Sequence, residues 1–175
     1  TVLPQEALAK TLRFSHDGKQ LAIGRDDRHI ALLDTSTFKD NVRLGPLNEA
    51  ALSLQFSGHD LFLFSGTADG HVVEWNVKSQ KNSHEWILSE SPVVSLLLRE
   101  DQVHLYAGTH NSEIFLINVW NQKVTARMPL MSGRLSAMNV ASNNSQFNAV
   151  TDKPTVFHFT ENPSNYDEEV PEESW

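Results

Sequence analysis

The sequence predicts an all-β fold in which a four-stranded antiparallel unit is repeated four times. Short apolar runs at 52–56, 61–64 and 72–75 are too brief for stable helices, and their β-branched and aromatic residues favour strands. Turn-forming residues separate these runs, and Asp69-Gly70 has the pattern of a tight hairpin. The whole pattern then returns every 42 residues along the chain.

Three markers keep the 42-residue spacing. An apolar residue ends the first predicted strand of each unit, at Phe14, Phe56, Leu98 and Val140. Glycine closes the second strand at Gly24, Gly66 and Gly108, and Val150 takes its place in the last unit. The third strand ends in an apolar–polar pair at Leu33-Asp34, Trp75-Asn76, Ile117-Asn118 and Phe159-Thr160. Independent markers on one period indicate a true repeat rather than chance.

In the first unit the strands are expected near 11–15, 20–24, 29–34 and 41–45. Asp27, Asp69 and Asn111 share one position in the turn between the second and third strands. Asp and Asn tolerate left-handed backbone and bond their own backbone, so they suit a short turn. We therefore assign a structural role to the turn residues and the repeated glycines. Together with one tryptophan, this structural set is Asp27, Asp69, Asn111, Trp75, Gly24, Gly66 and Gly108.

A period near 42 with four strands per unit is typical of a β-propeller blade. The sequence also resembles the WD40-repeat family in its Phe-Ser turns, beginning at Phe14 and Phe56, and in its Gly-x-x-Asp turns at 24–27 and 66–69. Trp75-Asn76 stands where that family has Trp-Asp, and the likeness extends over residues 9–160. The resemblance implies a partial form of the family's buried Asp-His-Ser-Trp network, with Asp69 and Trp75 as its best remnant.

The resemblance also implies a ring of about seven blades, so four blades are expected to be part of a larger propeller. Residues 1–3 are assigned to the closing strand of a preceding blade, because Thr1-Val2 lies 42 residues before Arg43-Leu44. The predicted blades are 4–46, 47–91, 92–133 and 134–166, followed by an acidic tail at 167–175. Each end blade is expected to expose an apolar face, with Leu12, Ile23 and Leu32 at the first end, which further blades of the same or another polypeptide would cover.

Composition excludes several classes of function. The formal net charge of −8 opposes direct nucleic-acid binding, which needs a basic surface. There is no apolar run near 18 residues and no signal-like N-terminus, so no membrane segment is expected. The absence of cysteine fits a reducing compartment and predicts an intracellular protein of the cytoplasm or nucleus.

Catalytic and cofactor chemistry is not expected. The eight histidines lack metal-ligand spacing, and the contiguous residues 57–60, Ser-Gly-His-Asp, have the letters of a catalytic triad without its geometry. No cofactor or metal is therefore predicted. Trp75, Trp86 and Trp120 fall on predicted strands and are expected to pack between blades.

The predicted function is a protein–protein interaction scaffold within a larger complex. The alternative is a propeller enzyme, a hydrolase or dehydrogenase, with a site in the central channel. In propellers of the resembled kind, the turns between second and third strands lie on one face with the connections between blades. The predicted partner-binding residues on that face are Asp26, Arg28, Asn48, Glu49, Glu90, His110, Arg134 and Asp152. The acidic balance favours a partner with a basic segment.

Overall fold

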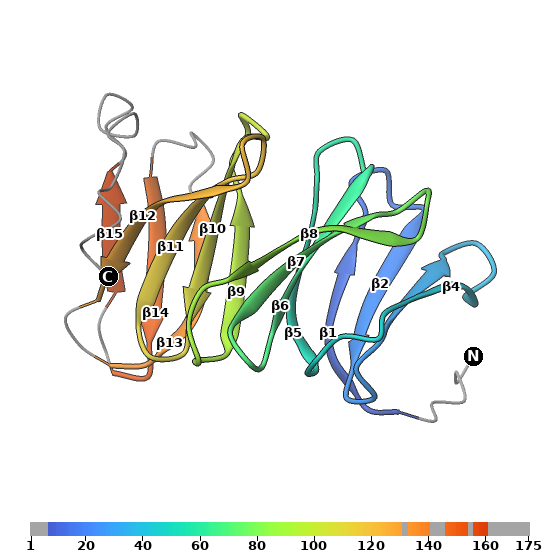
Figure 1. Ribbon diagram of the computed structural model, residues 1–175, viewed down its shortest axis with the longest axis horizontal. Helices are drawn as coiled ribbons and strands as arrows, with labels where there is room; N and C mark the ends of the chain where they lie inside the picture. Colours follow the sequence, from blue (N-terminus) through green and yellow to red (C-terminus); the bar gives the residue numbers. More distant parts are fainter. Residues whose placement is uncertain (1–6, 131–132, 141–145, 154–155, 161–175) are drawn as a thin grey trace.

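The computed structural model describes residues 7–130, 133–140, 146–153 and 156–160. Within these ranges the regular structure consists of fifteen strands, β1 to β15, and contains no helix. The strands form four separate antiparallel sheets, which Figure 1 shows side by side in chain order from blue to red. The prediction of an all-β chain made of propeller blades is therefore confirmed.

Each sheet is a meander whose strands follow one another in sequence order. The first blade contains β1 (Ala9–Phe14), β2 (Gln20–Arg25), β3 (Ile30–Asp34) and β4 (Lys39–Leu44). The second contains β5 (Ala51–Phe56), β6 (Phe62–Thr67), β7 (His71–Asn76) and β8 (Lys81–Ile87). The third contains β9 (Val93–Leu98), β10 (His104–Thr109), β11 (Glu113–Asn118) and β12 (Lys123–Pro129). The fourth contains β13 (Leu135–Val140), β14 (Gln146–Thr151) and β15 (Val156–Thr160).

The predicted closing strand at 1–3, the acidic tail at 167–175 and any fourth strand of the last blade lie outside the described residues. The strands that are described fall inside the predicted blade ranges.

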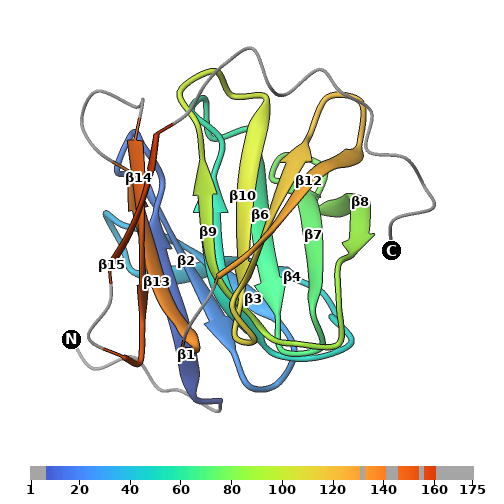
Figure 2. The ribbon, with the colours of Figure 1, turned by 90° about the vertical axis from the view of Figure 1, so that its left-hand side faces the viewer.

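The blades meet through their first strands. β1 contacts β5, β5 contacts β9, and β9 contacts β13, so these four strands form the inner side of the stack. In Figure 2, turned by 90°, β1 and β13 lie toward the left and the outer strands β8 and β12 toward the right. The second and third blades therefore present one broad face to the preceding blade and the other to the following blade.

The hydrophobic core is divided among the seams between blades. Successive side chains of a strand point to opposite faces, so each central strand supplies residues to two seams. In the first seam, Leu32 of the first blade packs with Phe56 and Trp75 of the second. The second seam joins Phe64 and Trp86 to residues of the third blade, and the third seam includes Tyr106 and Phe147, whose rings lie 4.5 Å apart. Burying one such side chain contributes about 1.5–3 kcal/mol.

The repeated glycines lie where the next blade approaches most closely. A Cβ added to Gly24 would lie 2.9 Å from the carbonyl oxygen of Ala51, and one added to Gly66 would lie 2.5 Å from Cγ1 of Val93. At Gly108 it would meet Leu135. The contacted residues are the first residues of β5, β9 and β13. Glycine is therefore needed because any side chain would push the following blade away.

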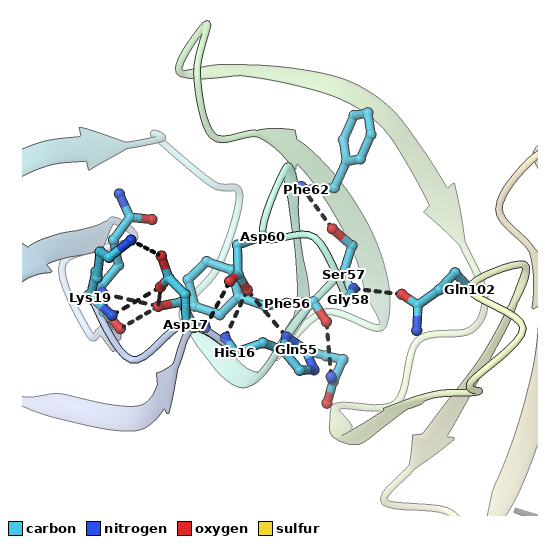
Figure 3. A network of polar contacts seen from close by, with 12 residues as sticks. His16, Asp17, Lys19, Gln55, Phe56, Ser57, Gly58, Asp60, Phe62 and Gln102 are labelled. Atoms are coloured by element: carbon cyan, nitrogen blue, oxygen red, sulfur yellow. Dashed lines mark hydrogen bonds and ion pairs between the residues drawn. The ribbon is translucent and has the colours of Figure 1, made fainter.

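Hydrogen bonds at the turns between the first and second strands of the blades also cross the seams (Figure 3). The carboxylate of Asp60 accepts hydrogen bonds from the backbone N–H groups of His16 and Asp17, at 2.8 and 3.0 Å. One blade further on, Gln102 Oε1 accepts from the backbone N–H of Gly58. Asp60 and Gln102 are 42 residues apart and both have positive φ, 56° and 58°. A turn of each of these two blades is thus completed by a residue of the blade that follows. Residues 57–60, which include the residue types of a catalytic triad, form one of these turns.

The expected position of Leu32 was wrong, because Leu32 does not lie on the outward face of the first blade. Ile23 pairs with Ala31, so these two residues share the outward face, and Leu32, which follows Ala31, points to the other face. Leu32 is therefore 1% exposed in the first seam. Ile23 does face outward but is buried, whereas Leu12 is 61% exposed.

The expectation for Trp120 was also wrong. Trp75 and Trp86 are buried at 5% exposure, but Trp120 is 81% exposed in the turn between β11 and β12. It follows Asn118, which ends β11, so the alternation of the strand no longer directs its side chain.

Candidate partner-binding face

Turns and blade connections come together on one side of the stack, which we call the turn face. It consists of the turns at 26–29, 68–70, 110–112 and 152–153 and the connections at 45–50, 88–92 and 133–134. The backbone joins them in the same way in each blade. Asp26 N–H donates to Leu8 O at 3.0 Å, His110 N–H to Pro92 O at 2.8 Å, and Asp152 N–H to Arg134 O at 2.9 Å.

The eight residues predicted to bind a partner all lie on the turn face. Of these eight residues, His110 is half-buried and the other seven are exposed, namely Asp26, Arg28, Asn48, Glu49, Glu90, Arg134 and Asp152.

Asp26 and Asp152 also have an internal role. Asp26 Oδ1 accepts a hydrogen bond from the backbone N–H of Leu8 at 2.9 Å, and Asp152 Oδ1 accepts one from Arg134 at 2.7 Å. These carboxylates tie the turn to the connection that precedes the first strand of the same blade. Substituting either residue therefore changes the shape of the face as well as its charge.

In the first three turns the left-handed position is one residue later than the Asp/Asn pattern suggested. Arg28, Gly70 and Ser112 have φ of 64°, 89° and 69°. Their carbonyl groups accept hydrogen bonds from the following connection, as Arg28 O does from Leu47 N–H at 2.8 Å. A residue other than glycine in this conformation costs roughly 1–2 kcal/mol. Arg28 is therefore held with its exposed side chain on the turn face at some expense of stability.

The Asp/Asn residues of the turns are fixed by a threonine position that the sequence analysis missed. Thr67 Oγ1 donates to Asp69 Oδ1 at 2.5 Å, and Thr109 Oγ1 donates to Asn111 Oδ1 at 2.6 Å. Thr151 occupies the same position in the fourth blade, and all three threonines are buried. Their 42-residue spacing was the signal that could have revealed them.

The first blade differs at this position, because Arg25 replaces the threonine. Asp27 there accepts hydrogen bonds from Arg43 Nη2 at 2.7 Å and from the backbone N–H of His29 at 3.1 Å. The turn is thus held by a charged pair in the first blade and by a hydroxyl in the next two.

Part of the network implied by the WD40 resemblance is present in the second blade. Trp75 Nε1 donates to Ser65 Oγ at 2.9 Å, and both residues are buried. Asp69 is held by Thr67, and His71 lies 2.7 Å from Glu85 and 3.8 Å from Asp69. His71 is the first residue of β7 and is hydrogen-bonded to Glu85 of the same blade.

A cavity of about 60 Å³ lies beside these residues, where the connection from the first blade meets the second. Its lining includes Asn48, Asp69, His71 and Glu85. This volume suits water molecules and is far below the size of an ordinary substrate pocket. In the described part of the chain, no three His, Asp or Glu side chains are grouped so that they could hold a metal ion.

Comparisons with known proteins give the fold. No family model matches the chain, and no curated protein matches it. Among solved structures it is similar to a chain of Kuenenia stuttgartiensis hydrazine synthase, with a TM-score of 0.82 and 12% sequence identity. The match covers 91% of this chain and 48% of that chain, so this chain spans about half the length of its structural neighbour. The chain is a β-propeller protein, with four blades among its described residues.

None of the described segments forms a helix of the length and apolar character needed to cross a membrane.

Proposed function

We propose that this chain is a non-catalytic, WD40-like interaction module whose turn face binds a protein partner within a larger complex. This function is supported by a backbone arrangement that recurs from blade to blade while the side chains on it differ. Asp26, Ala68, His110 and Asp152 donate the same backbone hydrogen bond in the four blades, and this position carries a carboxylate in the first and fourth blades, a methyl group in the second and an imidazole in the third. A surface of this kind lets a partner read each blade separately.

The charges of the turn face favour a partner with a basic segment. Four of the eight predicted residues are acidic, namely Asp26, Glu49, Glu90 and Asp152, and two are arginines, Arg28 and Arg134. An acidic excess of this kind speeds association with a basic surface and opposes nucleic acid. The module is proposed to work inside the cell, in the cytoplasm or nucleus, where a chain without cysteine needs no disulfide.

The test reverses charge at two exposed connections without disturbing the turn anchors. Proteins captured by the wild-type chain are first identified, and their affinities are then measured for the Glu49→Lys/Glu90→Lys double variant. We expect at least a tenfold loss of affinity, because buried or central charge reversals at interfaces typically cost more than about 1.4 kcal/mol. Glu100→Lys, at an exposed turn on the opposite side, is the matched control and should bind as wild type. Equal affinity for all three proteins would contradict the assignment of the face.

The alternative is a propeller enzyme with a site in the central channel. The structural neighbour is named as a synthase, which shows that this fold is found in an enzyme. Metal analysis and absorption spectra of the purified chain test this alternative, because a stoichiometric metal or cofactor would favour it over the interaction module.

A further inference from the structure

The turns between the second and third strands are surrounded by different charged side chains in the first three blades. Three positions, each repeated every 42 residues, make up this surrounding: the Asp or Asn of the turn, the residue at the start of the third strand, and a residue of the fourth strand. The fourth-strand position holds arginine in the first and third blades and glutamate in the second. The three sets are Asp27, His29 and Arg43, then Asp69, His71 and Glu85, then Asn111, Glu113 and Arg127.

In the two blades that have the arginine, its side chain pairs with an acid of the same blade. Arg43 Nη2 lies 2.7 Å from Asp27 Oδ2. Arg127 Nε donates a hydrogen bond to Glu113 Oε1 at 2.9 Å, and Asn111 Nδ2 lies 3.1 Å from Glu113 Oε2. A guanidinium group therefore balances a carboxylate beside the turn in both blades.

The second blade has two carboxylates at these positions and no arginine. Asp69 Oδ1 accepts a hydrogen bond from Thr67, and Glu85 Oε1 lies 2.7 Å from His71 Nδ1. Asp69 Oδ2 is 3.8 Å from His71 Nε2, which is too far for a hydrogen bond. Among the described residues, neither Asp69 Oδ2 nor Glu85 Oε2 has a hydrogen-bond partner. At pH 7 the two carboxylates outnumber the one imidazole, so the group keeps a net negative charge in either protonation state of His71.

The same two acids line the cavity of about 60 Å³ between the β4–β5 connection and the second blade. A water molecule needs about 10–15 Å³ in this measure, so the cavity has room for the head group of one side chain. Leu47, Val73 and Trp75 give part of its wall an apolar character. The side chains of Asp69 and Glu85 are 26% and 38% exposed, so a partner can reach them.

We propose that this cavity binds the guanidinium group of an arginine supplied by the partner of the turn face. The arginine of the partner takes the part that Arg43 and Arg127 play within their own blades. Its planar group can bond both carboxylates at once, which an ammonium group does less well, and its aliphatic stem can pack on the apolar wall. This inference rests on the proposed function, and it narrows the basic segment of the partner to one that presents an arginine.

The first test uses small probes, so it needs no identified partner. The amide of N-acetyl-arginine is titrated into the isotope-labelled chain, and NMR follows the indole N–H signal of Trp75, which lines the cavity. The Trp75→Phe variant assigns this signal. We expect a saturable shift with the arginine probe, at least about threefold weaker binding of the corresponding lysine probe, and no binding of the neutral citrulline probe. Equal affinity of the arginine probe and either of the other two probes would overturn the proposal.

Two substitutions of Glu85 test whether the probe binds in this cavity. Glu85→Arg gives the second blade the arginine of its neighbours, which should fill the site from within and abolish binding of the arginine probe. Two blades already carry arginine at this position, so the variant should fold, and its thermal melt checks this. Glu85→Gln keeps the shape of the side chain and should weaken binding of the arginine probe by at least about threefold. Wild-type affinity in either folded variant would contradict the site.

The last test measures proteins captured by the wild-type chain. Glu85→Arg should lower their affinity by at least about tenfold. Glu100→Arg makes the same change of charge at an exposed turn on the opposite side and should bind as wild type. Loss of affinity in Glu49→Lys/Glu90→Lys but not in Glu85→Arg would overturn the arginine site and leave the proposed function standing. Loss in Glu85→Arg alone would support the arginine site and contradict the wider assignment of the turn face.

Discussion

The first and second seams have the same geometry but differ in composition at one central position. Leu32 lies in the first seam at 1% exposure, and Glu74, 42 residues later, lies in the second at 8%. Glu74 pairs with Phe64 and shares its face. Burial raises the pKa of its carboxyl, and Ser83 only partly offsets this shift. The repeat therefore fixes where a side chain points, while local partners decide whether a carboxyl is tolerated there.

The largest effect is expected when the buried glutamate of the second seam is introduced at the equivalent position of the first seam. Leu32→Glu should lower the free energy of unfolding by about 3–5 kcal/mol at pH 7, because the buried charge would lie among apolar residues. Denaturant unfolding monitored by tryptophan fluorescence measures the change. Leu12→Glu is the control on the exposed end face and should stay within about 0.5 kcal/mol of wild type. Similar losses for both variants would mean that the two faces of the first blade are equally buried.

Closing the space between blades should have the next largest effect. Gly66→Val should cost about 1–3 kcal/mol or more, because the new side chain would meet Val93 and Ser53 of the second seam. Val150 is the natural valine at the same position of the fourth blade, where no described blade follows. The reverse change, Val150→Gly, should cost only about 0.5–1 kcal/mol, the usual penalty of glycine in a strand. Thermal melts of both variants make the comparison.

The polar links of the two seams should differ in strength. Asp60 accepts two backbone N–H groups with a carboxylate, whereas Gln102 accepts one with a neutral amide. Asp60→Ala should therefore cost about 1.5–3 kcal/mol and Gln102→Ala about 0.5–1.5 kcal/mol. Equal losses in chemical denaturation would show that charge adds nothing to this link.

The smallest effect is expected from restoring an apolar residue to the second seam. Glu74→Leu should raise the free energy of unfolding by about 0.5–2 kcal/mol at pH 7. Burial raises the pKa of Glu74, and the hydrogen bond to Ser83 only partly offsets this shift. The protonated form is thus favoured in the folded state, and its contribution is lost as pH rises through the folded pKa.

The advantage of the Glu74→Leu variant over wild type should therefore shrink as the pH falls toward 4 and be largest near neutrality. Unfolding measured from pH 4 to pH 8 tests the sign. An advantage that grows on acidification would mean that the carboxylate is stabilised by charge.

The sequence predicted the blades because three kinds of residue had to recur at one spacing. Glycine recurs at Gly24, Gly66 and Gly108 because backbone approach leaves no room for a side chain, and such a requirement is visible in sequence. The predicted position of Leu32 was wrong, because the face to which each side chain of a strand points depends on how that strand pairs with the next one. A two-residue turn at 27–28 would place Ile23 opposite Leu32, but the turn has three residues, 26–28, and this length places Ile23 opposite Ala31.

The sequence predicted that the turns and blade connections lie together, but not the contacts that hold them. The period placed the turns and connections together, and the structure joins them by backbone hydrogen bonds. The anchoring roles of Asp26 and Asp152 were not visible, because they depend on N–H groups 18 residues away in each case. The position of Trp120 was also not predicted, because β11 ends two residues before it and its large side chain lies in the turn at the surface instead of in the core.

The links through Asp60 and Gln102 have a consequence for synthesis on the ribosome. Since a turn of one blade is closed by the next blade, a completed sheet still lacks its last contacts when it first emerges. At the usual 5–20 residues per second, the 42 residues that follow take about 2–8 s to appear. The first and second blades thus lack these contacts until the next blade has been synthesised, and chaperones can bind the uncovered apolar face during this interval.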